Sequence, residues 1–583
     1  MITHEKRALS LVLLSSLVSF TANAEDRSHD WDSNHIRHVL LLSIDGMHAI
    51  DYINCSRGIS GVNGGQSYCP NLATLGQTGL NYLNTSTSKP SDSFPGLMAI
   101  VTGGSPRTFG AFYDVAYDRS LAPPAKTTGN GLAAGPCVAG AAPRGTTTEY
   151  EEGIDIDQTK LNGGAPGGAA LADGGIRAID PSRLVRDPSN NCAPVEPWNF
   201  IRTNTIFGVI HGAGGYTAWA DKHPAYSAVS GPGNGTNVDD YYSPEINSLV
   251  VNLPGVTIPN GISCATVPDP TQPGSWTDSF QNIRCYDTLK VRAILHQING
   301  RRHGGVRNAP VPTLFGMNFQ AVSGGQKLIE KNVGTGGYVD GEGTPTTELL
   351  HEIEFVDASV GEMITNLKDQ GLYDSTLILI TAKHGQSPVD PNRFLPIPGP
   401  NGTNGTTPAD LLASLLPYSE SPNNPTGIGP TQDDISLLWL ADSHQTNNAV
   451  STLEANATKA GIGEIFYGSS LDQMFNRPGL PPYGDPRSPD IIVAPNPGVV
   501  YTGSKKKLAE HGGFSHDDSN VILLVANPQI LARTITAATQ TSQVAPTILN
   551  VLGFKPGDLD AVRQEGTQVL PGANFHWDSS RNW

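Results

Sequence analysis

Residues 89–103 join a hydroxyl-rich turn to an apolar run, which is the pattern of a serine held at the start of a helix. Ser91 and Ser93 precede Pro95, and the apolar residues begin at Leu97. The start of a helix carries free backbone N–H groups and the positive end of the helix dipole, so it suits an anion. A serine there can attack a phosphoryl or sulfuryl group while the same N–H groups bind its oxygens. The alternative is that either serine only caps the helix.

Other reactive groups follow the two longest apolar runs. Residues 38–44 and 375–381 have the continuous apolar character of strands buried on both faces of a parallel sheet. Asp45 follows the first run, and Lys383 and His384 follow the second. Open α/β sheets place their sites at the carboxyl ends of strands, so we expect these side chains to converge. Together with a helix-start serine they indicate a metal-assisted hydrolase.

A further histidine, His511, lies in a glycine-containing segment between two late apolar runs at residues 490–494 and 521–526. Both runs are predicted strands. We expect His511 to join the same group at the strand ends, although a structural role for this histidine is the alternative.

The elements that must position these groups alternate between strands and helices. The strongest helical pattern covers residues 347–370 and ends at Gly371. With strands at 312–319 and 375–381 it predicts a right-handed crossover unit. We therefore predict an α/β fold with a mostly parallel central sheet flanked by helices and long loop insertions. Further elements are expected at residues 71–78, 81–85, 205–210, 216–220, 289–298 and 543–552.

Composition limits the classes of partner. The chain of 583 residues has a net charge of −17, which disfavours binding of nucleic acid or anionic membranes through a general basic surface. Residues 1–24 have the basic start, apolar run and small-residue end of a secretory signal peptide. We expect a secreted or periplasmic protein without a membrane anchor, whose mature chain begins near Glu25.

Six cysteines fit an oxidising compartment, and none of their spacings is CxxC, which argues against a zinc–thiolate or thioredoxin-type centre. Sequential pairing is the simplest of about fifteen connectivities. The predicted pairs are Cys55–Cys69, Cys137–Cys192 and Cys264–Cys285.

From residue 38 to about residue 562, the chain resembles the alkaline phosphatase superfamily, specifically its type I phosphodiesterase/nucleotide pyrophosphatase branch. The resemblance rests on these motifs: Ile44-Asp45-Gly46, Ser93-Phe94-Pro95-Gly96, Val101-Thr102-Gly103, Lys383-His384-Gly385, His511-Gly512-Gly513 and Ala545-Pro546-Thr547-Ile548-Leu549. It implies an alkaline-phosphatase-like sandwich in one hydrolase domain, residues 25–583, with insertions at about 106–200 and 390–480.

The resemblance also implies roles for individual residues. Ser93 would be the nucleophile that forms a covalent phosphoseryl intermediate, and Asp114 would contact the phosphoryl oxygen. Asp45, His384 and His511 would bind a divalent metal, for which Zn²⁺ is usual in the family. The implied substrate is a small-molecule phosphate ester or a nucleotide.

The chain departs from the family pattern in two places. Lys383 stands where the family has a metal-binding aspartate, and the Asp-x-x-x-His segment expected after the strand at 312–319 is missing. One metal ion is therefore the more cautious expectation, with Lys383 and Lys327 supplying positive charge to the substrate in place of metal. The polar cluster at residues 221–223 either replaces the lost ligands or belongs to a surface loop.

The sequence leaves two alternatives to a phosphoric ester hydrolase. The first is a relative of the sulfatases or phosphonate hydrolases. Sulfatases require the motif Cys/Ser-x-Pro-x-Arg to mature their nucleophile, and here Leu97 stands in the arginine position, which argues against sulfatase chemistry. The other is a catalytically reduced binding protein that keeps the fold, which the lost metal ligands motivate.

Overall fold

The structure is a computed structural model, and it describes residues 31–32, 36–128, 131–150, 179–246, 277–398, 406–418, 432–502, 507–573 and 575–576. The predicted signal peptide and Cys264 lie outside these residues, so the third predicted disulfide does too.

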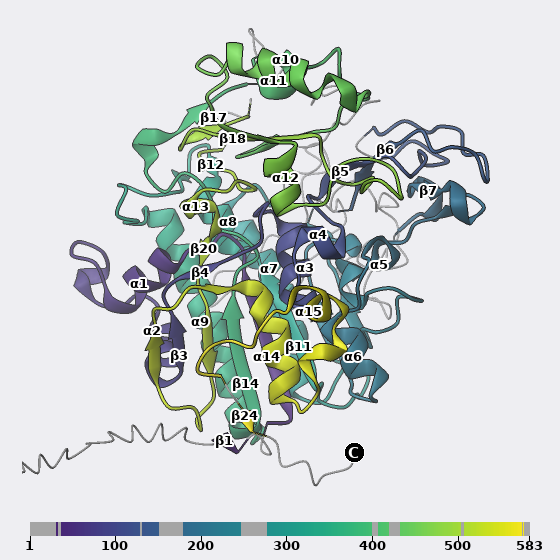
Figure 1. Cartoon of the computed structure of the whole chain (residues 1–583). Helices are drawn as coiled ribbons and strands as arrows, with labels where there is room; N and C mark the ends of the chain where they lie inside the picture. Colours follow the sequence, from purple (N-terminus) through teal and green to yellow (C-terminus); the bar gives the residue numbers. More distant parts are fainter. Residues whose placement is uncertain are drawn as a thin grey trace, which may run out of the picture.

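The described residues form an eight-stranded central sheet (Figure 1). Seven of its strands share one direction, and only β21 runs antiparallel to its neighbours β14 and β3. The predicted fold class, α/β with a mostly parallel sheet, is thereby confirmed. In spatial order the strands are β10 (Asp240–Tyr242), β9 (Ala218–Ala220), β11 (Leu314–Phe319), β2 (His38–Ile44), β14 (Thr376–Thr381), β21 (Leu524–Ala526), β3 (Leu80–Tyr82) and β22 (Arg533–Ile535).

Strand β2 lies at the centre of the sheet because nearly all its side chains are apolar and buried on both faces. Its neighbours β11 and β14 are parallel to it and in register, with Phe319 beside Ile44 and Thr381 beside Ser43. The three strands therefore end at the same edge of the sheet. The residues that follow them must lie together, as predicted.

Helices cover both faces of the sheet. One face, which includes Leu40, Leu42 and Ile44 of β2, packs against one group of helices in a single apolar cluster. These helices are α1 (Ala49–Arg57), α2 (Pro70–Thr78), α7 (Phe280–Ile298), α8 (Ala321–Lys327) and α9 (Thr347–Asp369). Helix α9 lies between β13 and β14 in the chain. It matches the strongest helical pattern in the sequence.

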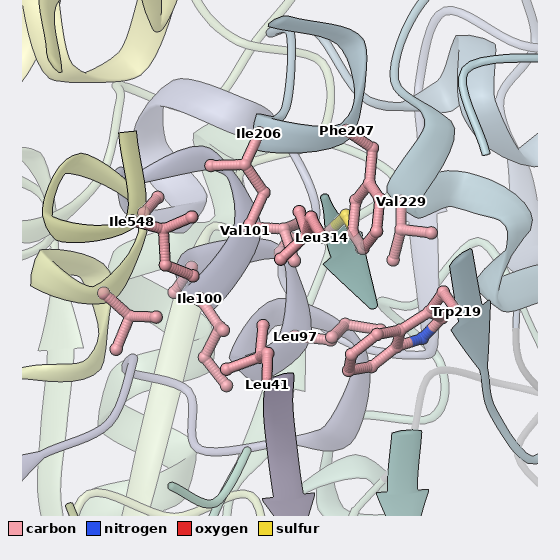
Figure 2. Packing of buried hydrophobic residues seen from close by; sticks show 14 of the residues in the cluster. Leu41, Leu97, Ile100, Val101, Ile206, Phe207, Trp219, Val229, Leu314 and Ile548 are labelled. Atoms are coloured by element: carbon pink, nitrogen blue, oxygen red, sulfur yellow. The ribbon is translucent and has the colours of Figure 1, made fainter. Parts of the chain in front are cut away.

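The opposite face, which includes Val39 and Leu41 of β2, packs against a second group of helices. Figure 2 shows Leu41 beside Leu97 and Ile100, with Trp219 closing one side of this cluster. The helices on this face are α3 (Ser93–Thr102), α4 (Pro106–Phe109), α5 (Pro197–Phe200), α6 (Ile206–Gly212), α14 (Val544–Val551) and α15 (Asp560–Glu565). The serine helix α3 is thus buried between the sheet and α14.

A smaller antiparallel sheet lies apart from the central one, at the top of Figure 1. It orders β16 (Ser436–Leu438), β18 (Ile491–Pro495) and β17 (Ile462–Tyr467), and an apolar cluster of its own packs α11 against it. The run at 490–494 is a strand as predicted, but it belongs to this sheet. The helices of this part are α10 (Pro408–Leu411), α11 (Thr446–Ala455) and α12 (Ser469–Met474).

The remaining short elements connect these layers. They are helix α13 (His516–Ser519) and the strand sets β1 (Trp31–Asp32) with β24 (Phe575–His576), β4 (Thr85–Ser86) with β20 (Asn520–Val521) and β23 (Thr539–Gln540), β5 (Val115–Asp118) with β6 (Thr146–Glu149), β7 (Arg186–Asp187) with β8 (Ala193–Pro194), β12 (Ile329–Glu330) with β13 (Gly334–Thr335), and β15 (Leu395–Pro396) with β19 (Val499–Val500).

Two of the predicted disulfides are present, Cys55–Cys69 and Cys137–Cys192. The first ties the end of α1 to the start of α2, and the second closes a long loop ahead of α5. Across the described ranges, none of the helices has the length and apolar character needed to cross a membrane.

Candidate active site

Ser93 is the first residue of α3, and its neighbours separate the roles of the two candidate serines. Asp92 is the N-cap, and its side chain accepts a hydrogen bond from Phe94 N at 3.2 Å. The hydroxyl of Ser91 donates to the carbonyl of Gly513 at 2.9 Å, which makes it a structural contact. Capping is therefore done by Asp92, and Ser93 is left to face the ends of the central strands.

Helix α3 reaches those strand ends because Gly96 has no side chain. A Cβ added at Gly96 would lie 2.2 Å from the carbonyl oxygen of Lys383, so any larger residue would push the helix away from the segment after β14. The same carbonyl accepts a hydrogen bond from the hydroxyl of Thr87. This close packing brings the first turn of α3 against His384.

The hydroxyl of Ser93 contacts two side chains. Its Oγ lies 3.1 Å from Nε2 of His384, and Nζ of Lys222 donates to it at 3.1 Å. The other ring nitrogen of His384, Nδ1, lies 2.7 Å from the carbonyl oxygen of Gly385. A carbonyl can only accept, so Nδ1 carries the proton and Nε2 of the neutral ring is an acceptor. Burial, partly offset by Asp45, lowers the pKa of His384 to about 4, which keeps the ring neutral.

Asp45 lies at the end of β2, as predicted, and one of its oxygens is surrounded by N–H donors. Oδ2 accepts hydrogen bonds from Asn318 Nδ2 at 3.1 Å and Gln320 Nε2 at 2.5 Å. Nζ of Lys383 lies 3.9 Å from the same oxygen, and Nε2 of His384 lies 3.8 Å from it. Burial alone would raise the pKa of Asp45, but the positive charges beside it outweigh burial and hold the pKa below its ordinary value.

The ammonium group of Lys383 is fully buried and bridges two acidic residues. It donates to Asp221 Oδ1 at 2.9 Å, in addition to its contact with Asp45. The other oxygen of Asp221 accepts from the indole N–H of Trp219 at 2.9 Å. The ammonium also lies 4.2 Å from the ring centre of Tyr226. Lys383 thus places a positive charge between Asp45 and Asp221.

His511 belongs to the same group of side chains. Its ring stacks on the ring of His384, with 3.8 Å between the ring centres, and its Nδ1 lies 3.5 Å from Asp92 Oδ1. The phenol of Tyr113 donates to the carbonyl of His511 at 3.1 Å. These contacts connect the late histidine segment to the N-cap of α3.

Asp114 reaches the site through its backbone. Its N–H donates to Asp92 Oδ2 at 3.0 Å, while its own Oδ1 accepts from Val115 N at 2.7 Å. The side chain of Asp114 thus bonds the N–H of Val115, the first residue of β5. A contact between this side chain and a phosphoryl oxygen stays a prediction.

The donor set does not fit the metal centre that the resemblance implies. Within the described ranges, no group of three or more His, Cys, Asp or Glu side chains is placed to hold a metal ion. Oδ2 of Asp45 accepts from two amide donors, whereas its Oδ1 is buried and has no hydrogen-bond partner among the described residues. An ammonium, Lys383, stands beside Asp45 where the family has a second carboxylate. The rings of His384 and His511 are stacked, with an angle of 28° between their planes.

Sequence reasoning missed or left open four residues of this group. Asn318 and Gln320 were not expected, although both come at the end of the predicted strand at 312–319. Lys222 belonged to a cluster whose role was open, and the structure brings it to Ser93. In that cluster Asp221 also joins the site, whereas His223 pairs with Glu245 at 2.7 Å. The sequence signal that could have identified them was their position, since each lies at or just after the carboxyl end of a strand of the central sheet.

Comparisons with known proteins place this site in a family. A family model described as type I phosphodiesterase / nucleotide pyrophosphatase matches residues 39–145 and 338–517. These ranges include Asp45, Ser93, His384 and His511. A search among curated protein sequences found no match.

Solved structures with a similar shape were also found. Murine ectonucleotide pyrophosphatase / phosphodiesterase 5 superposes with a TM-score of 0.49 and 12% identity over 89% of this chain and 96% of that chain. The human protein of the same name gives a TM-score of 0.47 and 12% identity over 89% of this chain and 95% of that one. An inactive variant of the murine protein, in complex with AMP, superposes with a TM-score of 0.48.

The family match rests on the segments that carry the strand-end aspartate, the helix-start serine and both histidines, in the order and positions described above. The chain belongs to the type I phosphodiesterase/nucleotide pyrophosphatase family, a branch of the alkaline phosphatase superfamily whose members are phosphoric ester hydrolases.

Proposed function

We propose that this protein hydrolyses phosphoric diester or pyrophosphate bonds in small molecules such as nucleotides, with Ser93 as the nucleophile. The observation that carries the proposal is the position of the Ser93 hydroxyl. It lies at the positive end of α3, within 3.1 Å of both His384 Nε2 and Lys222 Nζ. A hydroxyl with an acceptor on one side and a cation on the other is arranged for nucleophilic attack.

The proposed reaction has two steps. Oγ of Ser93 bonds to phosphorus, the bond from phosphorus to the leaving oxygen breaks, and a phosphoseryl intermediate forms. Water then attacks phosphorus, the bond to Oγ breaks, and the serine regains its proton. The α3 dipole and the neighbouring ammonium groups favour the negative charge that develops on the phosphoryl oxygens.

A metal ion is not used in these steps. The family is metal-dependent, and Zn²⁺ with Asp45, His384 and His511 as ligands is the expectation from the resemblance. The side chains described above do not fit a two-ion centre, so Zn²⁺ at this site stays a prediction. Metal content by elemental analysis tests it.

The test of the proposed function is hydrolysis of bis-p-nitrophenyl phosphate, with and without added Zn²⁺. Ser93→Ala should lower the rate by at least about 1,000-fold, because the nucleophile is lost. Ser91→Ala is the matched control, since it removes a hydroxyl two residues away that only bonds the Gly513 carbonyl. It should keep the activity.

Trapping gives a second readout. Acid quenching during turnover, followed by mass spectrometry, should find phosphate on Ser93 and not on Ser91. Equal background-level hydrolysis by wild type and Ser93→Ala would contradict the proposal and favour the catalytically reduced binding protein.

We also propose that the protein is exported. The signal-like residues 1–24 and the two disulfides support this, since disulfides persist mainly in oxidising compartments. N-terminal sequencing of the native protein should give a chain that begins near Glu25, and an intact Met1 would contradict it.

A further inference from the structure

Helix α7 places a buried ion pair behind the strand that supplies two of the active-site amides. Asp287 and Lys290 lie three residues apart on this helix, and both are fully inaccessible to solvent. Nζ of Lys290 lies 2.9 Å from Oδ1 of Asp287, and it also lies 4.6 Å from the ring centre of Tyr286. Because neither charge meets water, each must be compensated inside the protein.

The carboxylate of Asp287 holds the backbone that follows β11. Its Oδ2 accepts from the N–H of Gln320 at 2.7 Å and from the N–H of Ala321 at 2.8 Å. These two residues are the N-cap and the first residue of α8, and their N–H groups have no acceptor within that helix. Asp287 therefore caps α8 from a neighbouring helix.

Capping by Asp287 leaves the side chain of Gln320 available for the active site. The N-cap side chain of a helix commonly accepts from the N–H groups of its own first turn. Gln320 is the N-cap of α8, but its side chain makes no such bond. Its Nε2 instead donates to Oδ2 of Asp45 at 2.5 Å. The acceptor that α8 needs and the amide that Asp45 receives thus come from different residues.

The ammonium of Lys290 holds the same turn from the strand side. It donates to the backbone carbonyl of Asn318, which is the penultimate residue of β11. The side-chain amide of Asn318 donates to the same oxygen of Asp45, at 3.1 Å. Asp287 and Lys290 together bond three backbone groups between Asn318 and Ala321. These bonds determine the direction in which both amides point.

Asp45 connects this turn to the nucleophile. Its Oδ2 lies 3.8 Å from Nε2 of His384, and that nitrogen lies 3.1 Å from Oγ of Ser93. Misplacing a group at an active site by about 1 Å can lower the rate by roughly 100-fold. A rotation of the turn after β11 would move Asp45 and would therefore change the geometry around Ser93.

We propose that Asp287 and Lys290 are positioning residues of the active site, which orient the amides of Asn318 and Gln320 toward Asp45. This role rests on the proposed function, because it concerns the geometry of the same serine site. Replacing both partners of a buried ion pair by neutral side chains often leaves stability unchanged, whereas removing one partner leaves a buried charge uncompensated. Stability and positioning can therefore be measured separately.

The experiment compares two single variants with their double variant in the full mature chain. Asp287→Asn and Lys290→Met each leave one buried charge without its partner, so both should melt below the wild type. Asp287→Asn/Lys290→Met has neither charge, and the new amide oxygen can still accept from the Gln320 N–H. Its melting temperature should return close to that of the wild type.

The activity of the double variant should not return with its stability. Its kcat for bis-p-nitrophenyl phosphate should stay roughly 10-fold or more below the wild type, with little change in KM, because the Asn318 carbonyl has lost its donor. Gln320→Met removes the amide that lies on Asp45 and should also lower kcat. In the double-variant background Gln320→Met should lower kcat by a smaller factor than in the wild type, since its amide is already misdirected there.

Gln297→Leu is the control on the same helix. Nε2 of Gln297 donates to Oδ2 of Asp240 at 2.8 Å, ten residues along α7 from Asp287, and Gln297 is fully buried. The variant loses a buried hydrogen bond that is not part of the active site. Its melting temperature should fall and its kcat should stay that of the wild type.

The outcomes separate this role from the proposed function. A double variant that regains the kcat of the wild type would overturn the positioning role. A double variant that does not fold, or that melts no higher than the single variants, would overturn it too, since the pair would then be required for the fold. Wild-type hydrolysis that depends on Ser93 would leave the proposed function intact in each case. A wild type no faster than Ser93→Ala would overturn both.

Discussion

At the scale of single residues, the site is defined by how charge is paired around one hydroxyl. Lys383 is one of the two places where the sequence departs from the family pattern, and the structure shows what this lysine contacts. Its ammonium bridges Asp45 and Asp221, both fully buried. Removing one partner of a buried ion pair leaves an uncompensated charge, which costs more than the pair itself contributes.

Lys383→Met should therefore lower the free energy of unfolding by about 3–5 kcal/mol, because two buried carboxylates lose their counterion. Urea denaturation monitored by fluorescence measures this. The double variant Lys383→Met/Asp221→Asn should be more stable than the single one, since one of the uncompensated charges is gone. A single variant as stable as the wild type would show that Lys383 does not compensate these groups.

At the scale of elements, the site depends on how closely helix α3 approaches the segment after β14. The predicted helix is present and covers Ser93–Thr102, with Gly103 as its C-cap. Its distance from Lys383 is a tertiary property, set by the missing side chain of Gly96. The hydrogen bond from Thr87 to the Lys383 carbonyl fixes the strand side of the same contact.

Gly96→Ala should reduce both stability and activity. The added Cβ would lie 2.2 Å from the Lys383 carbonyl oxygen, so the helix must shift, at a cost of about 1–3 kcal/mol. Ser93 would move away from His384, and the hydrolysis rate should fall as well. Gly212→Ala is the control, because a Cβ there meets no atom within 4 Å. Its stability should be nearly unchanged in a thermal melt, and equal effects of the two substitutions would contradict this account.

At the scale of the whole molecule, a group of carboxyl groups lies where the smaller sheet approaches the segment around His511. Asp434, Glu510 and Asp518 are buried, and Asp433 is partly buried. Asp433 and Asp434 precede β16, Glu510 precedes His511, and Asp518 lies in α13. Burial, and then repulsion from Glu510, raises the pKa of Asp433 to about 7. Burial raises the pKa of Asp518 to about 6. We therefore expect the contact between the smaller sheet and the segment around His511 to depend on pH.

The sign of the pH effect follows from the raised values. An ordinary aspartate titrates near pH 4, so between about pH 4 and pH 7 the folded protein holds protons at these groups that the unfolded chain has released. The unfolded state binds fewer protons in this range, and the contribution of these groups to stability must fall as pH rises through it. It is fully present below about pH 4 and lost above about pH 7.

Asp433→Asn should be more stable than the wild type at pH 8, because the amide has no charge to bury and can still accept from the Tyr113 hydroxyl, which lies 3.0 Å from Asp433. We expect a melting temperature higher by about 1–4 °C at pH 8, and a difference that shrinks toward pH 4. Thermal melts across this pH range measure it. A constant difference at every pH would show that Asp433 does not titrate in the range stated.

Much of the architecture was readable from local patterns. Continuous apolar runs at residues 38–44 and 375–381 predict strands buried on both faces, and both are central strands. The helix at 347–370 was predictable from the helical spacing of its apolar side chains. The strand at 490–494 shows the limit of such patterns, since its residues specify a strand but not which sheet it joins. The boundaries of the predicted insertions stay a prediction.

Local patterns were enough to identify the candidates Asp45, Ser93, Lys383 and His384, because strand ends and helix starts can be predicted from neighbouring residues. Which charged side chains meet depends on the packed fold. Lys222 lies 129 residues from Ser93 and donates to it, and Lys383 lies 162 residues from Asp221. Such pairings depend on strand order and on how closely α3 packs, and no local pattern of residues encodes either.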